Sequence, residues 1–580
     1  MDKAQAAAIL DDVGDLLELR GDNPFEARAY HNAARTIGAL DDDLEALVAN
    51  GKIAAVPGLG KTLVQRVTEL VNTGQMTLHQ ELLAAIPAGL RAMLKIPGLG
   101  PKRIRQIADT LHITTLEELR AAAEGNQIAT LPGFGAKSQE NILKGLAFVS
   151  QHADHYLYPV AEADATAIAA TLRALPQVVR LSIAGSLRRR KEVVKDVDMV
   201  ASVAREEDRA AVMDALVALP QVASVTGKGD TKTSVILRPG IALDLRVVTD
   251  DDYPYTLHHF TGSRDHNIAL RGRAQREGIK INEYGLFRGD ERIPVRDERE
   301  FYQALGMHYV EPEMREDRGE IELALKGDLP TLVTEADLRG ILHVHSTWSD
   351  GRVSIREMAE ATLALGKSYL GMCDHSKYAA YAGGLNEDAV KRQHEEIDQL
   401  NAEYAGRLRI LKGTECDILK DGALDYDDNT LASFDFVVVS IHSQFQLPPA
   451  EQTARLIRAL ENPYTSILGH PTGRILLQRD GYAPDLDAVI DRAGELGTAI
   501  ELNADPLRLD LDWRLHRRAV ERGVAIPINP DAHTTDGLLN LRYGVGIARK
   551  GCLTPADVLN TRPVDDLLAW FAALRKRKGA

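Results

Sequence analysis

Residues 341–351 read ILHVHSTWSDG, a short apolar run that ends in His343 and His345 and is followed by Asp350. Histidines one residue apart on a strand project from the same face. A two-histidine cluster alone does not identify a metal site, because a single histidine is more often an ordinary core or surface residue. The question is whether other apolar runs of the chain end in the same way.

Six further apolar runs follow this one, and stretches at helical period such as SIREMAEATLALG and DLDAVIDRAGELG lie between them. The runs are SYLGMCDH, LRILKGTECD, FDFVVVSIH, TSILGHP, TAIELNA and VAIPINPDAH. Repeated strand–helix units predict a parallel barrel, in which the chemistry collects at the carboxyl ends of the strands.

Nearly every run ends in a residue that can bind a metal ion. These residues are His343, His345, Asp350, His375, Glu415, His442, His470, Asp531 and His533. So many imidazole and carboxylate groups at one barrel mouth would be costly to bury without cations. Mixed nitrogen and oxygen donors suit Zn²⁺, Mn²⁺ or Fe better than Mg²⁺, and Glu415 could bridge two ions.

Size and composition indicate a multidomain protein. The 580 residues suggest several domains, and 44% hydrophobic with 26% charged residues is typical of a globular chain. No apolar run has membrane-spanning length, and the start MDKAQAAAILDDVG lacks a signal-peptide pattern. Cys373, Cys416 and Cys552 show no paired spacing, which favours a reducing compartment. We therefore expect a cytoplasmic monomer that does not bind membranes.

The net charge of −15 argues against nucleic-acid binding over the whole surface, but it leaves room for local basic tracks such as RRRK at 188–191. The first 150 residues also contain one element three times, as VPGLGK (56–61), IPGLGP (96–101) and LPGFGA (131–136). Helical patterns flank each copy. Bare glycine backbone and the N–H groups of a helix start suit a phosphate backbone.

A tight turn without a ligand is the alternative for any one copy of this element. The element resembles the helix-hairpin-helix of DNA repair proteins. Together with Lys232, the candidate DNA-binding residues are Gly58, Gly60, Lys61, Gly98, Gly100, Gly133 and Gly135.

A second cluster of acids lies in the middle of the chain. In KDVDMV, Asp196 and Asp198 are two apart on a predicted strand, so they share a face and repel each other unless a cation lies between them. Asp244, after a predicted hairpin turn at Pro239-Gly240, can supply a third carboxylate. Three oxygen ligands suit a pair of Mg²⁺ ions. An ordinary solvent-facing Asp-x-Asp is the alternative when these aspartates are considered alone.

The flanking motifs point to a nucleotide. GSLRR lies before the aspartates, and HHFTGSRDHN (258–267) lies after them. A triphosphate could be bound by the main chain of the turn at Gly185, by the Ser186 hydroxyl and by the paired N–H donors of the Arg189 guanidinium. The flat ring of Phe260 would form a wall for the sugar and base of a nucleotide, and Gly262 would let them approach the main chain closely.

Residues 1 to 318 resemble a family X DNA polymerase, similar to DNA polymerase beta, with these motifs in the same order. The resemblance implies primer extension by two-metal nucleotidyl transfer, with gapped or primed DNA and dNTPs as partners. Asp196, Asp198 and Asp244 would hold Mg or Mn, with Asp244 nearest the primer hydroxyl. Asn267 would face the nucleotide.

Two positions depart from the family pattern. Arg66 stands where relatives with a lyase activity carry a Schiff-base lysine, and arginine is a poor imine-forming nucleophile. We therefore do not expect a lyase at that position, with Lys61 as a substitute that nothing supports. His259 stands where many relatives carry a tyrosine that discriminates between nucleotides at the sugar 2′ position. We therefore expect weaker discrimination against ribonucleotides.

Residues 340–575 resemble the PHP domain, a distorted seven-unit barrel that holds up to three metal ions, and many PHP domains hydrolyse phosphoesters. The resemblance implies two or three Zn, Mn or Fe ions, and Arg474 in GHPTGR is a candidate phosphate contact. The predicted domains are a helix-hairpin-helix domain (1–85), fingers with two further hairpins (86–150), a nucleotidyltransferase palm (151–250), a thumb (251–318), a linker (319–339) and a PHP barrel (340–580).

We therefore predict a multidomain α+β and α/β chain. Its functions would be short-gap filling in DNA repair and trimming of 3′ ends, as a 3′-5′ exonuclease, a 3′-phosphatase or an abasic-site endonuclease. One alternative is a repair nuclease whose polymerase part only binds DNA. Another is a non-catalytic DNA-binding scaffold whose metals only stabilise the barrel.

Overall fold

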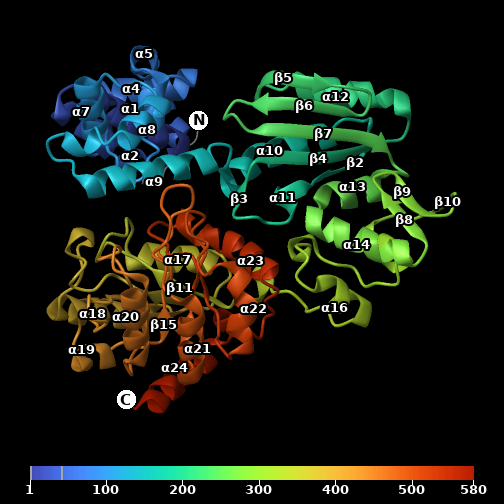
Figure 1. The fold of residues 1–580 in the computed structure, drawn as a ribbon. Helices are drawn as coiled ribbons and strands as arrows, with labels where there is room; N and C mark the ends of the chain where they lie inside the picture. Colours follow the sequence, from blue (N-terminus) through green and yellow to red (C-terminus); the bar gives the residue numbers. More distant parts are fainter. Residues whose placement is uncertain (1–2, 39, 41–42, 580) are drawn as a thin grey trace. The chain divides into compact units, whose positions relative to one another are not determined.

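The structure is a computed structural model that describes residues 3–38, 40 and 43–579. The predicted first and last domains thus each include residues outside this description, namely 1, 2, 39, 41, 42 and 580. The chain divides into two compact units, Met1–Ala153 and Asp154–Ala580 (Figure 1). The finer domain boundaries stay predictions. No helix among the described residues is long and apolar enough to cross a membrane.

The first unit is helical, as predicted. Leu10, Val13 and Leu17 of its first helix recur at helical spacing and are buried in one core with the other helices. The elements are α1 (Lys3–Arg20), α2 (Pro24–Gly38), α3 (Leu44–Ala49), η1 (Lys52–Ala55), α4 (Lys61–Thr73), α5 (Thr77–Ala85), α6 (Ala88–Met93), α7 (Pro101–Leu111), α8 (Leu116–Glu124), η2 (Ile128–Thr130) and α9 (Ala136–His152).

The second unit begins with a five-stranded sheet in the order β2-β4-β7-β6-β5. The strands are β2 (Val178–Ile183), β4 (Asp196–Val203), β5 (Val222–Lys228), β6 (Lys232–Leu237) and β7 (Ala242–Thr249), with a short pair β1 (Tyr156–Leu157) and β3 (Val193–Val194) beside them. The predicted hairpin is confirmed, since β6 and β7 pair antiparallel, whereas β4 and β7 pair parallel.

Helices cover both faces of this sheet. Helices α10 (Tyr158–Arg173) and α12 (Arg209–Val217), which follows the turn η3 (Glu206–Asp208), bury one face (Figure 1). Val197 and Met199 of β4 belong to that core. Val200 points to the other face, where it packs with Tyr253 of α13 (Tyr253–Thr261). Because side chains alternate along a strand, Asp196 and Asp198 lie on the α13 face.

A small α+β region follows, with its own core. It comprises α14 (Arg264–Arg276), the antiparallel strands β8 (Ile279–Asn282), β9 (Gly285–Arg288) and β10 (Glu291–Ile293), α15 (Glu298–Ala304) and η4 (Pro312–Met314). The segment predicted as a linker contains α16 (Glu320–Lys326) and η5 (Glu335–Asp337). Its main chain is anchored to the C-terminal region, because Val333 N–H donates to the Leu553 carbonyl at 2.9 Å.

Every apolar run predicted as a strand after residue 340 contains one. The strands are β11 (Gly340–Val344), β12 (Tyr369–Met372), β13 (Arg409–Asp417), β14 (Phe436–Ser440), β15 (Ile467–Leu468), β16 (Ala499–Ile500), β17 (Leu502–Asn503) and β18 (Ile528–Asn529). Strands β11 to β16 form one parallel sheet in chain order, and β17 pairs with β18. A parallel bridge between Val344 and Ala532 joins the last run to the first, as expected of a distorted barrel.

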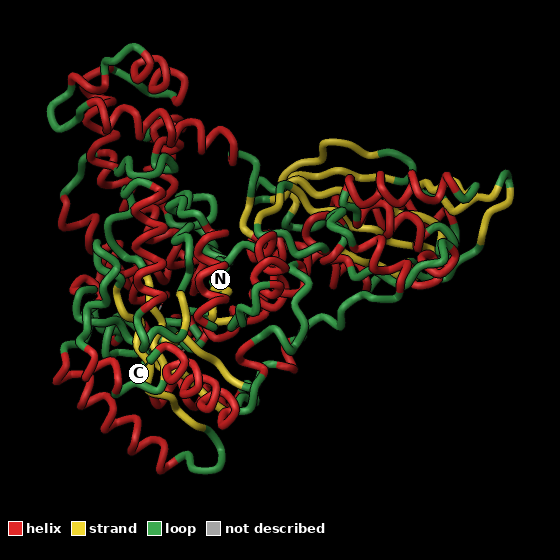
Figure 2. Tube along the Cα trace, turned by 60° about the horizontal axis from the view of Figure 1, so that its bottom comes forward, coloured by secondary structure: helices red, strands yellow, loops and turns green. Residues whose placement is uncertain are grey.

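Helices enclose these strands (Figure 2). They are α17 (Ile355–Ala364), α18 (Glu387–Glu403), α19 (Asp428–Ala432), α20 (Pro449–Glu461), α21 (Leu486–Leu496), α22 (Trp513–Glu521), α23 (Leu541–Lys550) and α24 (Val564–Lys578), with the turns η6 (Ala380–Ala382), η7 (Asp536–Asn540) and η8 (Leu559–Thr561). The parallel register brings the carboxyl ends of the strands to one barrel mouth. The candidate metal ligands that end the apolar runs are therefore placed at that mouth.

Candidate catalytic centres and nucleic-acid interface

The three aspartates of the sheet lie together. In the parallel register of β4 and β7, Asp198 is directly opposite Asp244, and Asp196 precedes Asp198 by two residues on the same face. Lys232 lies 2.6 Å from Asp244 Oδ2, and Ser234 Oγ donates to Asp244 Oδ1 at 2.6 Å. The predicted DNA contact Lys232 is thus paired with one of these carboxylates.

The electrostatics of this cluster suit a cation. Burial, followed by the charges of Asp196 and Asp244, raises the pKa of Asp198 to about 7. Burial and Asp244 also raise the pKa of Asp196. Partly buried like charges raise each other's pKa because the anionic forms repel, and a divalent cation between them removes that repulsion. The donor set, made only of carboxylate oxygens, fits Mg²⁺ or Mn²⁺.

A bare turn is packed against these carboxylates. Gly185 begins the one-turn helix α11 (Gly185–Arg188) with φ of 60°, and a Cβ atom there would lie 2.2 Å from Asp198 Oδ2. Any side chain at 185 would therefore displace the carboxylate. The neighbouring Ser186 Oγ is buried and has no hydrogen-bond partner among the described residues, so its hydrogen-bonding capacity is not used within that part of the fold.

The RRRK segment is not a DNA-facing basic track, because its three arginines fold inward. Arg188 donates to Thr261 Oγ1 and Glu298 Oε2, each at 2.6 Å. Arg189 Nε donates to Glu316 Oε1 at 3.0 Å, and its Nη1 donates to the Thr261 carbonyl. Arg190 binds the Tyr158 hydroxyl and Glu162. Each of the three arginines therefore meets an acceptor within the fold.

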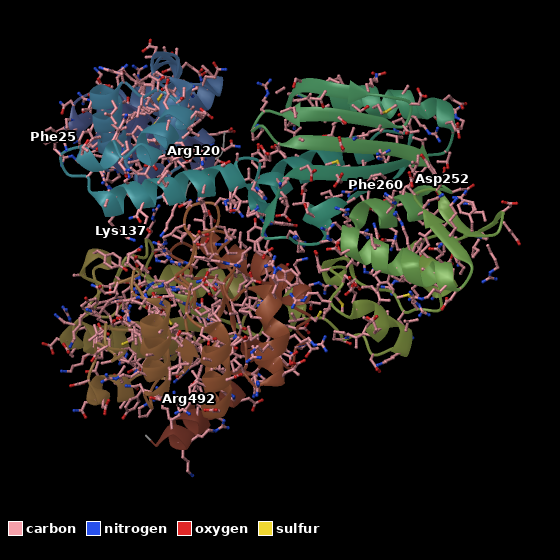
Figure 3. All side chains as sticks on the ribbon, in the orientation of Figure 1. Phe25, Arg120, Lys137, Asp252, Phe260 and Arg492 are labelled. Atoms are coloured by element: carbon pink, nitrogen blue, oxygen red, sulfur yellow. The ribbon has the colours of Figure 1, made fainter. Side chains whose placement is uncertain are left out.

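The residues predicted around the nucleotide base surround the end of α13. Phe260, labelled in Figure 3, carries the Arg246 guanidinium 4.3 Å from its ring centroid. Asn267 Nδ2 donates to the His259 carbonyl at 2.9 Å. His259 Nδ1 contacts Arg271 at 2.8 Å, and burial together with Arg271 lowers the pKa of His259.

Gly262 completes this group. Its φ is 67°, and a Cβ atom at Gly262 would lie 3.0 Å from Arg189 Nη1. The structure therefore places Gly262 beside Arg189, which links the predicted sugar wall to the predicted phosphate site.

The three predicted hairpins share one backbone conformation. Gly58, Gly98 and Gly133 have positive φ values of 86°, 74° and 78°, which favour glycine. The second glycine of each copy caps the following helix in an extended conformation that any residue can adopt; these caps are Gly60, Gly100 and Gly135. A Cβ atom at any of these caps would meet no atom of the described residues within 4 Å. Internal packing therefore does not explain glycine there, whereas the close approach of an external backbone would.

Helix α4 begins at Lys61, which is exposed directly after the first hairpin. Arg66, one turn further, pairs with Glu69 at 3.3 Å.

At the barrel mouth, buried histidines that were predicted to bind metal ions lie around the carboxylate of Glu415 on β13. Its Oε1 lies 2.9 Å from His470 Nε2, 3.2 Å from His442 Nε2 and 3.4 Å from His343 Nε2. Its Oε2 lies 3.1 Å from His375 Nδ1. This carboxylate is therefore central to the cluster, where it is able to bridge cations.

Two further carboxylates complete the cluster. Asp531 Oδ1 lies 3.2 Å from His345 Nε2, and Asp350 contacts His375 and His533 at 3.6 and 3.4 Å. Three groups of these side chains bring their ligand atoms within 4.8 Å of one another: His345, Asp350, His375 and His533; His343, His345 and Glu415; and His375, Glu415 and His442. His470 and Asp531 flank these groups through Glu415 and His345.

The residues present fit metal ions. Several buried imidazole nitrogens have no hydrogen-bond partner within the described part of the chain, among them His343 Nε2 and both ring nitrogens of His345. Although burial opposes ionisation, His442 and the neighbouring imidazoles hold the pKa of Glu415 well below its usual value. Anionic carboxylates beside unpartnered imidazole nitrogens are the donor set that Zn²⁺, Mn²⁺ and Fe prefer.

The backbone is strained at two of these positions. His343 and Asp531 have positive φ values of 59° and 52°, which non-glycine residues rarely adopt. Such conformations persist where the surrounding structure imposes them, and they cluster at functional sites.

Three acids that support the cluster were not predicted. Glu501 accepts from His343 Nδ1 at 2.9 Å and thereby fixes the ring, leaving Nε2 toward Glu415. Asp417 lies 3.3 Å from His442 Nδ1. Asp374 accepts from Ser346, Ser349 and Gln393. A signal existed for Asp417, because Glu-x-Asp in GTECD places both acids on one face of β13.

Arg474, predicted as a phosphate contact, has another position. Its Nε donates to the Arg508 carbonyl at 2.8 Å, and its Nη1 donates to Asp512 Oδ2 at 2.8 Å. Arg508 instead faces the cluster, with Nε 3.6 Å from Asp531 Oδ2. Arg508 is therefore a cation at the mouth, and Arg474 supports the loop that carries it.

Comparisons with known protein families agree with this architecture. Models of a helix-hairpin-helix domain and of a SAM-like helix-hairpin-helix tandem match residues 1–76 and 90–147. The model of the DNA polymerase beta thumb matches residues 256–316, and the model of the PHP domain matches residues 342–521.

Individual relatives cover the same regions. The DNA polymerase/3′-5′ exonuclease PolX of Bacillus subtilis (strain 168) is 40% identical over 575 residues, which is 98% of this chain and 99% of that protein. A repair DNA polymerase X of African swine fever virus is 29% identical over 23% of this chain and 78% of its own length. A probable phosphatase of Syntrophotalea carbinolica is 27% identical over 40% of this chain and 93% of its own length.

The fold and the comparisons together define a nucleotidyltransferase of the DNA polymerase beta type joined to a PHP domain. The chain belongs to the family of bacterial family X DNA polymerases with a C-terminal PHP domain, to which the Bacillus subtilis PolX protein belongs. The predicted family and fold class are confirmed.

Proposed function

We propose that this chain is a DNA polymerase that fills short gaps at the aspartates of β4 and β7, and a 3′-5′ exonuclease that trims 3′ ends at the barrel mouth. Family membership supports both enzyme classes. The observation that carries the polymerase assignment is the register of Asp198 with Asp244, against which the Gly185 turn is packed.

Asp196, Asp198 and Asp244 would hold Mg²⁺ or Mn²⁺, which when bound neutralises phosphate charge and favours attack by the primer hydroxyl. Asp244 would lie nearest the primer end, and Ser234 fixes the orientation of its carboxylate. Ser186 and Arg189 would bind the phosphates of the incoming dNTP. Phe260, Gly262 and Asn267 would contact its sugar and base.

At the barrel, His343, His345, Asp350, His375, Glu415, His442, His470, Asp531 and His533 would hold two or three Zn, Mn or Fe ions. Arg508 would orient the scissile phosphate by charge-assisted hydrogen bonds. Tyr381, whose ring lies 6.4 Å from that of His375 and is 73% exposed, offers a surface on which a terminal base can stack. A 3′-phosphate or an abasic site would meet the same groups, so the hydrolytic substrate can extend beyond a normal 3′ nucleotide.

The hairpins of the first unit would bind the DNA backbone through main-chain N–H groups, without reading its sequence. Gapped or primed DNA and dNTPs are thus the proposed partners of a monomeric enzyme in the cytoplasm of its cell. Salt should weaken the binding, because phosphate contacts release counterions.

One experiment separates this proposal from its rivals. A labelled gapped substrate is incubated with dNTPs and Mn²⁺ or Mg²⁺, using wild type, Asp198→Ala and His343→Ala. Asp198→Ala should lose nucleotide addition and keep hydrolysis, and His343→Ala should do the reverse. Failure of the wild type to add nucleotides would favour a polymerase part that only binds DNA, whereas nucleotide addition by Asp198→Ala would indicate different catalytic residues. Lower thermal stability of His343→Ala with unchanged hydrolysis would favour a scaffold.

A further inference from the structure

The loop that carries the proposed phosphate-binding arginine is enclosed by helices of the PHP barrel. Glu192, four residues after Arg188, accepts from Trp513 Nε1 at 2.9 Å and from Arg514 Nη1 at 3.0 Å. On α23, Gly546 lies so close to Arg190 that a Cβ atom would stand 3.2 Å from its Cδ. The packing between the palm and the barrel is therefore close at this loop.

Lys550 lies at the centre of this contact. It is the last residue of α23, and its side chain is fully buried. Its Nζ donates to the Arg189 carbonyl at 3.1 Å, forms an ion pair with Glu316 and lies 4.6 Å from the centroid of the Trp513 ring. An ammonium group from the hydrolytic domain is thus bonded directly to the main chain of the polymerase loop.

Glu316 is shared by two cations. Its Oε1 accepts from Lys550 Nζ and, at 3.0 Å, from Arg189 Nε. The Glu316 and Arg189 side chains are only 10% and 11% exposed, so their interaction is weakly screened. Because Lys550 and Arg189 share the Glu316 carboxylate, each cation weakens the electrostatic attraction between Glu316 and the other cation. Without Lys550, Glu316 would hold Arg189 alone and more tightly.

We propose that Lys550 is a positioning residue of the polymerase site. By sharing Glu316 and fixing the Arg189 main chain, it weakens the hold of Glu316 on the guanidinium, which also donates to the Thr261 carbonyl, and so favours its turning toward the triphosphate of the incoming nucleotide. The inference rests on the proposed phosphate-binding role of Arg189. It assigns to the barrel a part in nucleotide binding that does not involve the barrel's metal ions, because Lys550 reaches the palm through α23.

The test uses the full-length protein in single-nucleotide gap filling, with KM for the dNTP, kcat, exonuclease rate and melting temperature measured for each variant. Lys550→Met should raise the KM about tenfold or more, as expected when a charged hydrogen bond is lost, with kcat less affected. Its exonuclease rate should stay near that of wild type. Lys576→Met, at an exposed position on α24, is the matched control and should change nothing.

A second substitution distinguishes positioning from simple stabilisation. In the double variant Lys550→Met with Glu316→Gln, the side chain at 316 carries no charge that holds Arg189, so the KM should return toward the wild-type value. Glu316→Gln alone should have a KM at or below that of wild type. A raised KM for Glu316→Gln overturns the proposal, and this variant decides the matter if Lys550→Met does not fold.

Arg189→Met distinguishes a failure of the Lys550 role from a failure of the phosphate-binding role of Arg189. If Arg189→Met raises the KM and Lys550→Met folds but leaves it unchanged, the positioning role of Lys550 is wrong and the proposed function stands. If Arg189→Met itself leaves the KM unchanged, the phosphate-binding role of Arg189 fails, and the role of Lys550 fails with it.

Discussion

Arg474 donates its Nε–H to the main-chain oxygen of Arg508, and this contact holds Arg508 beside Asp531 at the barrel mouth. Arg474 is further fixed by Asp512 at 2.8 Å. One arginine therefore supports the backbone on which a second arginine is presented to the cluster of candidate metal ligands. The distinction matters for mutagenesis, because loss of either arginine should impair hydrolysis, but by different routes.

Arg508→Met should lower the exonuclease kcat/KM roughly 10- to 100-fold, the range expected for one charge-assisted contact to a phosphate, and should leave gap filling unchanged. The measurement is 3′-end trimming under single-turnover conditions. Arg492→Met is the control, since Arg492 lies on α21 and pairs with Glu461 (Figure 3). Full activity of Arg508→Met would mean that the scissile phosphate lies elsewhere.

Replacing Gly60, Gly100 and Gly135 together by alanine should weaken DNA binding without unfolding the protein. The added methyl groups would meet no atom within 4 Å in residues 3–38, 40 and 43–579, but they would stand between the helix starts and a phosphate backbone. The measurement is the Kd for gapped DNA at several salt concentrations, with melting temperature as the control. An unchanged Kd would show that these turns do not approach DNA.

Chelation of metal ions should lower the melting temperature of the wild type, because repulsion among the cluster carboxylates returns when cations leave. Glu415→Gln should contain less metal by elemental analysis and should lose hydrolysis while keeping nucleotide addition. Its melting temperature should respond less to chelation than that of wild type. Equal metal content in both proteins would contradict a bridging role for Glu415.

His259→Tyr should increase discrimination against ribonucleotides. His259 is oriented by Arg271, and its carbonyl accepts from Asn267, so a larger ring at this position would reach further toward a bound sugar. The measurement is the ratio of kcat/KM for dNTP and rNTP on a gapped template. Equal ratios in wild type and variant would remove this position from sugar selection.

The KM for dNTP should rise above about pH 8. Burial lowers the pKa of Lys550 to about 8, while the neighbouring Glu316 opposes that shift. Lys550 faces Glu316, Arg189, Glu192 and Trp513. When it loses its proton as the pH rises, Glu316 holds Arg189 alone. Lys550→Arg stays charged across this range, so its KM should rise less between pH 7.5 and 9.

Local patterns were sufficient to predict the strands and the gathering of the candidate ligand residues at one barrel mouth. His343, Glu415 and His470 end short apolar runs, and a parallel fold brings such ends together whatever the details of the helices. Arg508 could not be predicted in this way, because it lies in a loop positioned by Arg474, 34 residues earlier. The RRRK segment was misinterpreted for the same reason, since the acceptors of its arginines lie in distant segments of the chain.

The burial of Glu192 and Glu316 against the barrel has a consequence for anyone who wishes to express the two enzymes separately. A cut at residue 318 or 340 would separate Trp513 and Lys550 from these carboxylates. Each fragment would then expose to solvent a surface that is buried in the intact chain. Truncated chains are therefore poor substitutes for the intact protein in assays of either activity. Engineering of this chain should begin from point substitutions in the intact molecule.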